Sequence, residues 1–240
     1  MLTDDDDSEL DEAWRDGDLW SRERHVPTSS PGSCRTLAEL LVRAPARPWR
    51  ELPPDASAAP GCHADRRRTL RHEFERAIVE QLAAHRVDLV LCDSFMSVLG
   101  PLVLSAYPGR ILNVHPGITR PGARAQLLGP TPTRDAYTRA VYGFVITDDK
   151  RLVRRPVGPP VRVMYDGVPR DAVAVAPVAE TGVTVHVVTE RVDEGPIVLE
   201  QSYAFDPRAI SPEAIRARNY ELKRDLVPRA LLKHLDELSA

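Results

Sequence analysis

The sequence predicts an α/β fold in which a mostly parallel sheet is flanked by helices. Two short, mostly apolar runs at residues 87–92 and 110–116 are separated by a segment of helical character. Strands that are apolar throughout are typical of a parallel sheet covered on both faces, and a strand–helix–strand order indicates an α/β fold. Between residues 141 and 178, β-prone runs alternate with turn signals, which indicates added hairpins. These observations together predict a Rossmann-like sheet with a hairpin insertion.

The N-terminal quarter differs in composition from the rest of the chain. Residues 4–7 are four consecutive aspartates, which are typical of a solvated tail. Two stretches rich in proline, at residues 27–32 and 53–61, indicate loop or linker, and no run before residue 87 has the character of a central strand. We therefore expect residues 1–63 to be an atypical, loop-rich segment and residues 64–240 to be the main domain.

Helical patterns follow this segment. Residues 65–85 predict an amphipathic helix, because apolar side chains recur at helical spacing at Leu70, Phe74, Ala77, Ile78 and Leu82. Residues 95–106 predict a helix or helical turn between the two apolar strands. After a loop rich in glycine, proline and threonine, a short helix is expected from about Arg134.

The C-terminal part of the chain predicts two strands and a last helix. Valines alternate with other residues over residues 182–189, which predicts one strand, and residues 197–205 predict another. Ser211 is a candidate N-cap and Pro212 a candidate first helical residue. Pro228 is expected to kink or break this helix, because proline lacks the backbone N–H that a helix interior needs.

The composition excludes several classes of protein. The 240 residues are 42% hydrophobic and carry a net charge of −3, so no global charge favours nucleic acid or an anionic membrane as a partner. No apolar run is long enough to span a membrane, and the acidic N-terminus lacks the features of a secretory signal. The three cysteines show no zinc-ligand spacing, which indicates a reducing, cytoplasmic location and no structural metal. The sequence carries no signal for an oligomeric state.

Asn113 and His115 are the first candidate functional residues. They stand two apart on a predicted strand, so both side chains leave the same face, and the strand stops at Pro116. Ligands of open α/β sheets gather at the carboxyl ends of strands. An amide and an imidazole placed there can donate hydrogen bonds to an oxyanion and move a proton. Taken alone, such a pair is more often a polar strand end.

Two further polar residues extend the candidate site. Asp193 lies in a turn with Gly195 and Pro196, and a carboxylate close to His115 would favour the charged imidazolium. His186 lies on the strand at residues 182–189. A histidine on a buried strand more often has a structural role, in this case with Thr184 as the expected partner on the same face.

Four segments in this order resemble the glycinamide ribonucleotide transformylase superfamily. They are FMSVL at 95–99, GRILNVHP at 109–116, TGVTVHVV at 181–188 and VDEGP at 192–196, within a match from about residue 72 to residue 238. The resemblance implies transfer of a formyl group from 10-formyltetrahydrofolate to an amine, with residues 64–240 as the formyltransferase-like domain. It implies that Asn113 steadies the oxyanion, that His115 assists proton transfer, and that Asp193 charges His115 and organises water. It also implies a folate pocket made by Phe95, Met96, Ser97, Val98, Leu99, Thr189, Glu190, Arg191, Val192, Glu194 and Gly195, and no metal.

The sequence departs from the purine-pathway members of this superfamily. It has no counterpart before residue 64 of their glycine-rich loop for the substrate phosphate, so a phosphorylated ribosyl substrate is not expected. The stretch after His115 is most similar to the formyltransferases of hydroxamate siderophore assembly, which formylate N5-hydroxyornithine. An amino-sugar or glycinamide ribonucleotide acceptor, or a non-catalytic folate-binding relative, are the alternatives. The insertion at residues 141–178 is a candidate substrate lid.

Acceptor contacts can be proposed from charge. A small zwitterionic amine or hydroxylamine needs a cation for its carboxylate and an anion for its ammonium. Arg120, Arg124 and Arg134 are candidates for the first, and Asp135 or Glu190 for the second. Each of these side chains is, on its own, more often solvated than functional.

Overall fold

The computed structural model describes residues 2–3, 25–27, 34–36, 42–43 and 62–239. Most of the segment predicted to be loop-rich, residues 1–63, therefore lies outside the described residues. The chain divides into two compact units, Met1–Ile111 and Leu112–Ala240.

The first unit contains parallel strands. Strand β5 (Val90–Cys92) is buried along its whole length, as its apolar sequence predicts. Strand β1 (Leu2–Thr3) pairs in parallel with β5 and with β4 (Val42–Arg43). The expectation that no central strand precedes residue 87 is thus wrong, since β1 lies between β5 and β4. Two-residue strands are too short to show any periodicity. Strands β2 (His25–Pro27) and β3 (Cys34–Thr36) form an antiparallel pair.

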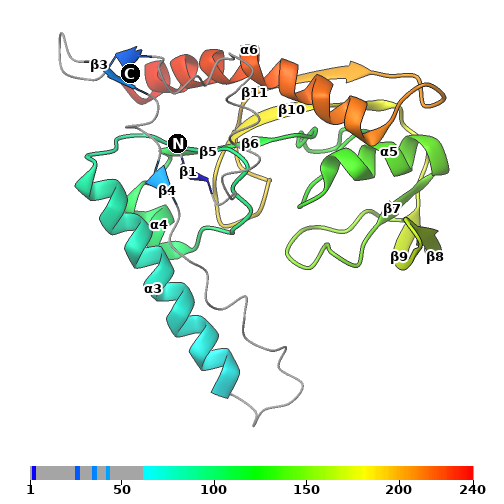
Figure 1. The fold of residues 1–240 in the computed structure, drawn as a ribbon, viewed down its shortest axis with the longest axis horizontal. Helices are drawn as coiled ribbons and strands as arrows, with labels where there is room; N and C mark the ends of the chain where they lie inside the picture. Colours follow the sequence, from blue (N-terminus) through cyan, green and yellow to red (C-terminus); the bar gives the residue numbers. More distant parts are fainter. Residues whose placement is uncertain (1, 4–24, 28–33, 37–41, 44–61, 240) are drawn as a thin grey trace. The chain divides into compact units, whose positions relative to one another are not determined.

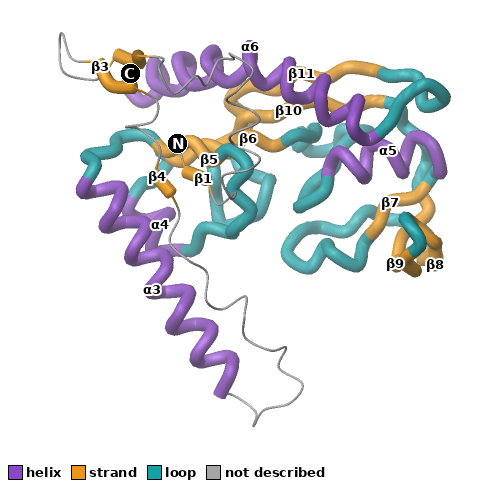
Figure 2. Tube along the Cα trace, in the orientation of Figure 1, coloured by secondary structure: helices purple, strands orange, loops and turns teal. Residues whose placement is uncertain are grey.

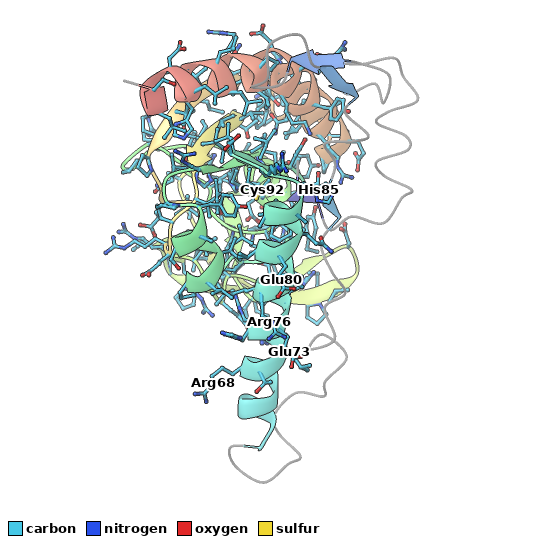
Figure 3. The ribbon with its side chains drawn as sticks, turned by 90° about the vertical axis from the view of Figure 1, so that its left-hand side faces the viewer. Arg68, Glu73, Arg76, Glu80, His85 and Cys92 are labelled. Atoms are coloured by element: carbon cyan, nitrogen blue, oxygen red, sulfur yellow. The ribbon has the colours of Figure 1, made fainter. Side chains whose placement is uncertain are left out.

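Helix α3 (Cys62–Ala84) confirms the predicted amphipathic helix. Phe74, Ile78 and Leu82 are buried, while charged side chains lie along the same helix, among them Glu73, Arg76 and Glu80 (Figure 3).

A buried carboxylate joins α3 to the helix that follows. Oε2 of Glu75 accepts a hydrogen bond of 3.2 Å from the backbone N–H of Leu102, in the first turn of α4 (Pro101–Ala106). Helix first turns leave backbone N–H groups without partners, so this contact fixes where α4 begins. Residues 95–99 precede the helix and are not helical. The predicted helix at residues 95–106 therefore forms only over its second half.

The second unit is built on antiparallel strands. Strand β10 (Glu180–Val187) pairs with β6 (Ile111–His115) on one side and with β11 (Ile197–Ala204) on the other. Helix α6 (Pro212–Ser239) packs along β10 and β11 (Figure 1).

The start of α6 confirms the predicted N-cap, because the Ser211 hydroxyl accepts a hydrogen bond of 3.2 Å from the N–H of Ala214. Of the kink or break expected at Pro228, the break does not occur, since the helix continues through Pro228 to Ser239. Leu226, Val227 and Ala230 are buried around the proline, and this packing holds the helix on both sides of it.

The segment between β6 and β10 carries one helix and a small sheet (Figure 2). Helix α5 (Pro132–Tyr142) is followed by β7 (Phe144–Ile146), β8 (Pro160–Tyr165) and β9 (Val168–Ala174), which form an antiparallel sheet in the order β7-β9-β8. Asp166 and Gly167 join β8 to β9, and both have positive φ, as a two-residue hairpin turn requires. The β-prone runs at residues 141–178 thus form hairpins.

These elements confirm the α/β fold class, with parallel and antiparallel strands and flanking helices. Within the described part of the chain, no helix combines the length and the apolar character that crossing a membrane requires.

Candidate active site

The pairing of β6 with β10 brings the candidate residues of the second unit together. In the antiparallel register, Asn113 lies opposite His186, and His115 lies opposite Thr184. Residues directly opposite each other in such a pair project from the same face with their Cβ atoms about 5 Å apart. The imidazole of His186 therefore lies beside the Asn113 amide.

His115 is buried, and both of its ring nitrogens face protein groups. Nε2 lies 2.8 Å from the carbonyl oxygen of Leu127. Because a carbonyl only accepts, Nε2 carries a proton and donates it. Nδ1 lies 3.6 Å from Oδ1 of Asp193. The structure thus brings together the imidazole and carboxylate that stand far apart in the sequence.

His186 belongs to the same cluster. Nδ1 donates to the carbonyl of Val187 at 3.1 Å, and Nε2 lies 3.2 Å from Nδ2 of Asn113. In the neutral ring, Nε2 accepts from the Asn113 amide and so fixes its orientation. Nε2 also lies 3.6 Å from Oδ1 of Asp193, so this oxygen faces two imidazoles.

The partner expected for His186 is wrong. The Thr184 hydroxyl lies within hydrogen-bonding distance of the Gly117 carbonyl, at 2.8 Å, and of Oε2 of Glu200, at 2.9 Å. Sequence reasoning favoured a structural role for His186, because burial on a strand was visible and the register against β6 was not. The alternation that places Thr184 and His186 on one face of the strand was the only feature of the sequence that could have indicated a role for His186 in the site.

Asp193 is held in an unusual backbone conformation. Its φ of 58° lies in the left-handed region, which aspartate tolerates better than most residues. Oδ2 accepts a hydrogen bond of 2.8 Å from the backbone N–H of Gly129. Burial acts to raise the pKa of Asp193, but His115, His186 and the Gly129 N–H together outweigh burial and lower the pKa from 3.8 to about 2. Asp193 is therefore a carboxylate at neutral pH.

The charge state expected for His115 is corrected. Burial lowers its pKa below the ordinary value of 6.5, and the opposing effects of Asp193 and the Leu127 carbonyl do not restore it. His186 and Lys150 act in the same direction as burial. The ring is consequently neutral near pH 7. If a proton is added to Nδ1, the Asp193 carboxylate stabilises it.

The residues predicted to bind folate fall in both units. The segment 95–99 belongs to the first unit; there Leu99 is buried, Met96 is exposed, and Phe95, Ser97 and Val98 are half-buried. The segment 189–195 belongs to the second unit and surrounds Asp193; Glu190, Arg191 and Glu194 are exposed, Thr189 and Val192 half-buried, and Gly195 buried. Their role in binding folate stays a prediction.

The acceptor contacts require one correction. Asp135 is fully buried, with Oδ1 held by Arg134 at 2.9 Å and Oδ2 by Lys150 at 2.6 Å, so it is not placed to bind an acceptor. Nη1 of Arg134 pairs with Asp149 at 2.8 Å, which also commits this guanidinium to the protein. Arg120 and Arg124 are both exposed, and Nε of Arg120 lies 3.6 Å from Oε1 of Glu200.

Lys150 was missed by sequence reasoning. It is almost completely buried although lysine is among the most exposed residue types. Its neighbours Asp148, Asp149 and Arg151 give it the appearance of a solvated charged turn, so nothing local indicated burial. Within the described residues, no group of three or more His, Cys, Asp or Glu side chains is arranged to hold a metal ion.

Comparison with known proteins identifies similar sequences. Residues 46–121 match the sequence model of the formyl transferase family. Over 158 residues, the chain is 29% identical to the phosphoribosylglycinamide formyltransferase of Bacillus subtilis (strain 168), covering 66% of this chain and 59% of that protein. Over 168 residues, it is 26% identical to the formyltetrahydrofolate deformylase of the same organism, covering 70% of this chain and 42% of that protein. The chain thus spans 42 to 59% of the length of these two relatives.

Solved structures show a similar fold. PvdF of pyoverdin biosynthesis, described as an N10-formyltetrahydrofolate-dependent formyltransferase, superposes with a TM-score of 0.58 at 23% identity, covering 97% of this chain and 79% of that one. The phosphoribosylglycinamide formyltransferase of Bacillus halodurans superposes with a TM-score of 0.54 at 18% identity, covering 97% of this chain and 77% of that one. At these identities the likeness concerns the fold.

Proposed function

We propose that this chain transfers a formyl group from 10-formyltetrahydrofolate to the nitrogen of a small amine or hydroxylamine. The observation that carries this proposal is the single cluster formed by Asn113, His115, His186 and Asp193. It combines an amide donor, two imidazoles and an ionised carboxylate. The similarity to two Bacillus subtilis enzymes named for formyl groups supports the same chemistry.

Asn113 is the group best placed to meet negative charge on the formyl oxygen. Its side chain is only partly buried, and one N–H of the amide is directed to His186. Because this contact sets the orientation of the amide, its second N–H can donate to a ligand. A donor fixed in advance costs no reorganisation when charge develops, and removing one such donor typically lowers kcat about 100- to 1,000-fold.

His115 and Asp193 are suited to hold the proton that the acceptor nitrogen loses. Since Nε2 of His115 donates to Leu127, the lone pair of the neutral ring is on Nδ1, which faces Oδ1 of Asp193. A proton taken up by Nδ1 from the acceptor nitrogen would therefore be stabilised by the carboxylate. It then passes to N10 of the leaving tetrahydrofolate, as the bond between N10 and the formyl carbon breaks. The distance of 3.6 Å exceeds a hydrogen bond, but such contacts are often long without substrate and shorten when it binds. The formyl donor, when bound, supplies the group that is transferred.

We propose N5-hydroxyornithine, in siderophore or related natural-product biosynthesis, as the acceptor. Three features support this choice: the resemblance after His115, the hairpins inserted between β6 and β10, and a likeness to PvdF that covers 97% of the chain. Glycinamide ribonucleotide is the second candidate, because the relative that is 29% identical is named for that substrate.

An acceptor screen tests the proposal. The protein is incubated with 10-formyltetrahydrofolate and, separately, with N5-hydroxyornithine, glycinamide ribonucleotide, an amino sugar or no acceptor, and products are read by mass spectrometry. We expect a formylated hydroxylamine, and we expect His115→Ala to lower kcat about 100- to 10,000-fold. His85→Ala, at an exposed position just after α3, is the matched control.

The other products of the screen have defined meanings. If only glycinamide ribonucleotide or an amino sugar is formylated, the proposed acceptor is wrong and the proposed formyl transfer is retained. Formate released without any acceptor would indicate a deformylase. Folate binding without turnover on any acceptor, or near-normal turnover by His115→Ala, would refute the proposed site.

A further inference from the structure

Three consecutive residues, Leu127, Leu128 and Gly129, support the candidate active site through their backbone. The carbonyl of Leu127 accepts from His115, and the N–H of Gly129 donates to Asp193, each at 2.8 Å. We call Leu127–Gly129 the presenting loop, since it offers one backbone group to each member of the imidazole–carboxylate pair. A displacement of this loop would therefore affect both contacts.

The middle carbonyl of the presenting loop, that of Leu128, points to Lys150. The Nζ atom of Lys150 donates a hydrogen bond to this oxygen and also lies 2.6 Å from Oδ2 of Asp135 on α5. Both side chains are essentially inaccessible, at 1% for Lys150 and 0% for Asp135. Burying an ammonium is unfavourable unless its N–H groups find hydrogen-bond partners. Lys150 therefore depends on its contacts with the Leu128 carbonyl and the Asp135 carboxylate.

We propose that Lys150 is a positioning residue: it holds the presenting loop by Leu128 and thereby sets the placement of His115 and Asp193. Asp135 acts through Lys150 by fixing the direction of its ammonium. The segment that follows β7 therefore reaches the active site through this side chain. The effect on turnover rests on the proposed function, whereas the effect on the placement of His115 does not.

The fit between Lys150 and the presenting loop supports this role. A Cβ built on Gly129 would lie 3.2 Å from both Cδ and Nζ of Lys150, so the glycine leaves room for the lysine side chain to pass. Gly129 also has a φ of +102°, which glycine adopts without strain. After burial and the contributions of Asp193, Leu127 and His186, the positive charge of Lys150 is a further influence on the pKa of His115, which it lowers.

A neighbouring ion pair provides a matched comparison. Arg170 of β9 and Asp148 lie 3.2 Å apart, and Asp148 stands two residues before Lys150 along the chain. Both side chains are partly exposed, and Nη1 of Arg170 donates its hydrogen bond to Asp148. If Lys150 and Asp135 only stabilise the insertion, removing either ion pair should have a similar effect. If Lys150 positions the presenting loop, only removal of the Lys150–Asp135 pair should affect His115.

The experiment compares two double variants of the full chain. Lys150→Met/Asp135→Asn removes both charges without leaving either one buried alone, and Arg170→Met/Asp148→Asn is its control. The first readout is the imidazole Nε2–H proton of His115, observed by NMR in protein labelled in histidine and assigned with His115→Gln. The second is kcat and KM with 10-formyltetrahydrofolate and the acceptor found in the screen.

We expect the Nε2–H signal in the wild type and in the control, and its loss by fast exchange in Lys150→Met/Asp135→Asn. We also expect kcat of that variant to fall about 10- to 100-fold with KM for the folate nearly unchanged, because a small misplacement impairs chemistry more than binding. A retained signal with wild-type kcat would overturn the proposal.

Two further outcomes keep the proposal testable. Should the double variant fail to fold, Lys150→Arg, which keeps a charge for Asp135 but not the ammonium geometry, is read by the same signal. Absence of formyl transfer by the wild type would count against the proposed function, and the imidazole signal would still decide whether Lys150 holds the loop.

Discussion

Asp135 and Asp193 are both buried aspartates of the second unit, and their surroundings differ sharply. Asp135 is inaccessible, and its oxygens lie 2.6 Å from Lys150 and 2.9 Å from Arg134. Asp193 accepts a short bond of 2.8 Å from the Gly129 N–H, and its other oxygen faces His115 and His186 at 3.6 Å.

The difference separates a carboxylate that holds structure from one that can take part in chemistry. Asp135 is held at close range by the side chains of Arg134 and Lys150, so its contacts are already complete without a ligand. The partners of Asp193 are imidazoles, which can take up and release a proton, and at 3.6 Å from its Oδ1 they can move closer when a ligand binds. Backbone strain at Asp193, with φ at 58°, fits a functional position better than a purely structural one.

The largest expected effect is on the free energy of unfolding, when the charge of Asp135 or of Asp193 is removed. Asp135→Asn leaves the buried ammonium of Lys150 without a carboxylate, which should lower the free energy of unfolding by about 3–5 kcal/mol. Asp193→Asn keeps the shape and tolerates positive φ, and should cost at most about 2 kcal/mol while abolishing most formyl transfer. Urea denaturation and turnover are measured on both variants, with the exposed Asp225→Asn as control. Equal losses of stability in the two variants would mean that the two aspartates do not differ in structural role.

The second prediction concerns stability in acid. The pKa of Asp193 is lowered from 3.8 to about 2, so its contribution is complete above about pH 3.8 and is lost as the pH falls to about 2. A shift of this size is worth about 2 kcal/mol. The pKa of His115 is lowered from 6.5, so the unfolded chain takes up its proton first, and stability also falls as the pH drops below about 6.5.

Denaturation curves at a series of pH values measure both effects. Asp193→Asn should flatten the dependence below pH 3.8, and His115→Gln should flatten it below pH 6.5. An unchanged pH dependence in both variants would mean that neither the Asp193 carboxyl nor the His115 imidazole has a lowered pKa in the folded protein.

The sequence was sufficient for the elements that carry a repeating pattern. The amphipathic spacing of Phe74, Ile78 and Leu82 predicted α3, and alternation predicted the strand that became β10. It missed β1 and β4, because two residues have no period. The break that it allowed at Pro228 does not occur, because packing on both sides of the proline outweighs the lost hydrogen bond.

The candidate site could be predicted only from the segments that resemble a known family. Asn113, His115 and Asp193 could be named, since they stand in recognisable segments. The inclusion of His186 depends on the register of β10 against β6, which a single sequence does not reveal. The burial of Asp135 and Lys150 depends on how the chain returns after β7, and both residues read locally as surface charges.

The smallest expected effect comes from Gly129, where the surroundings of the two aspartates meet. Its N–H binds Asp193, while a Cβ would lie 3.0 Å from Val153 and 3.2 Å from Lys150. Gly129→Ala should lower the free energy of unfolding by about 1–2 kcal/mol, from strain at positive φ and from this crowding. Gly122→Ala is the control, because Gly122 also has positive φ but nothing lies within 4 Å of its added Cβ. Denaturation of both variants separates strain from crowding. A turnover defect only in Gly129→Ala would show that the contact between Lys150 and the presenting loop affects Asp193. If both variants lose the same stability and keep full turnover, Gly129 does not couple the two aspartates.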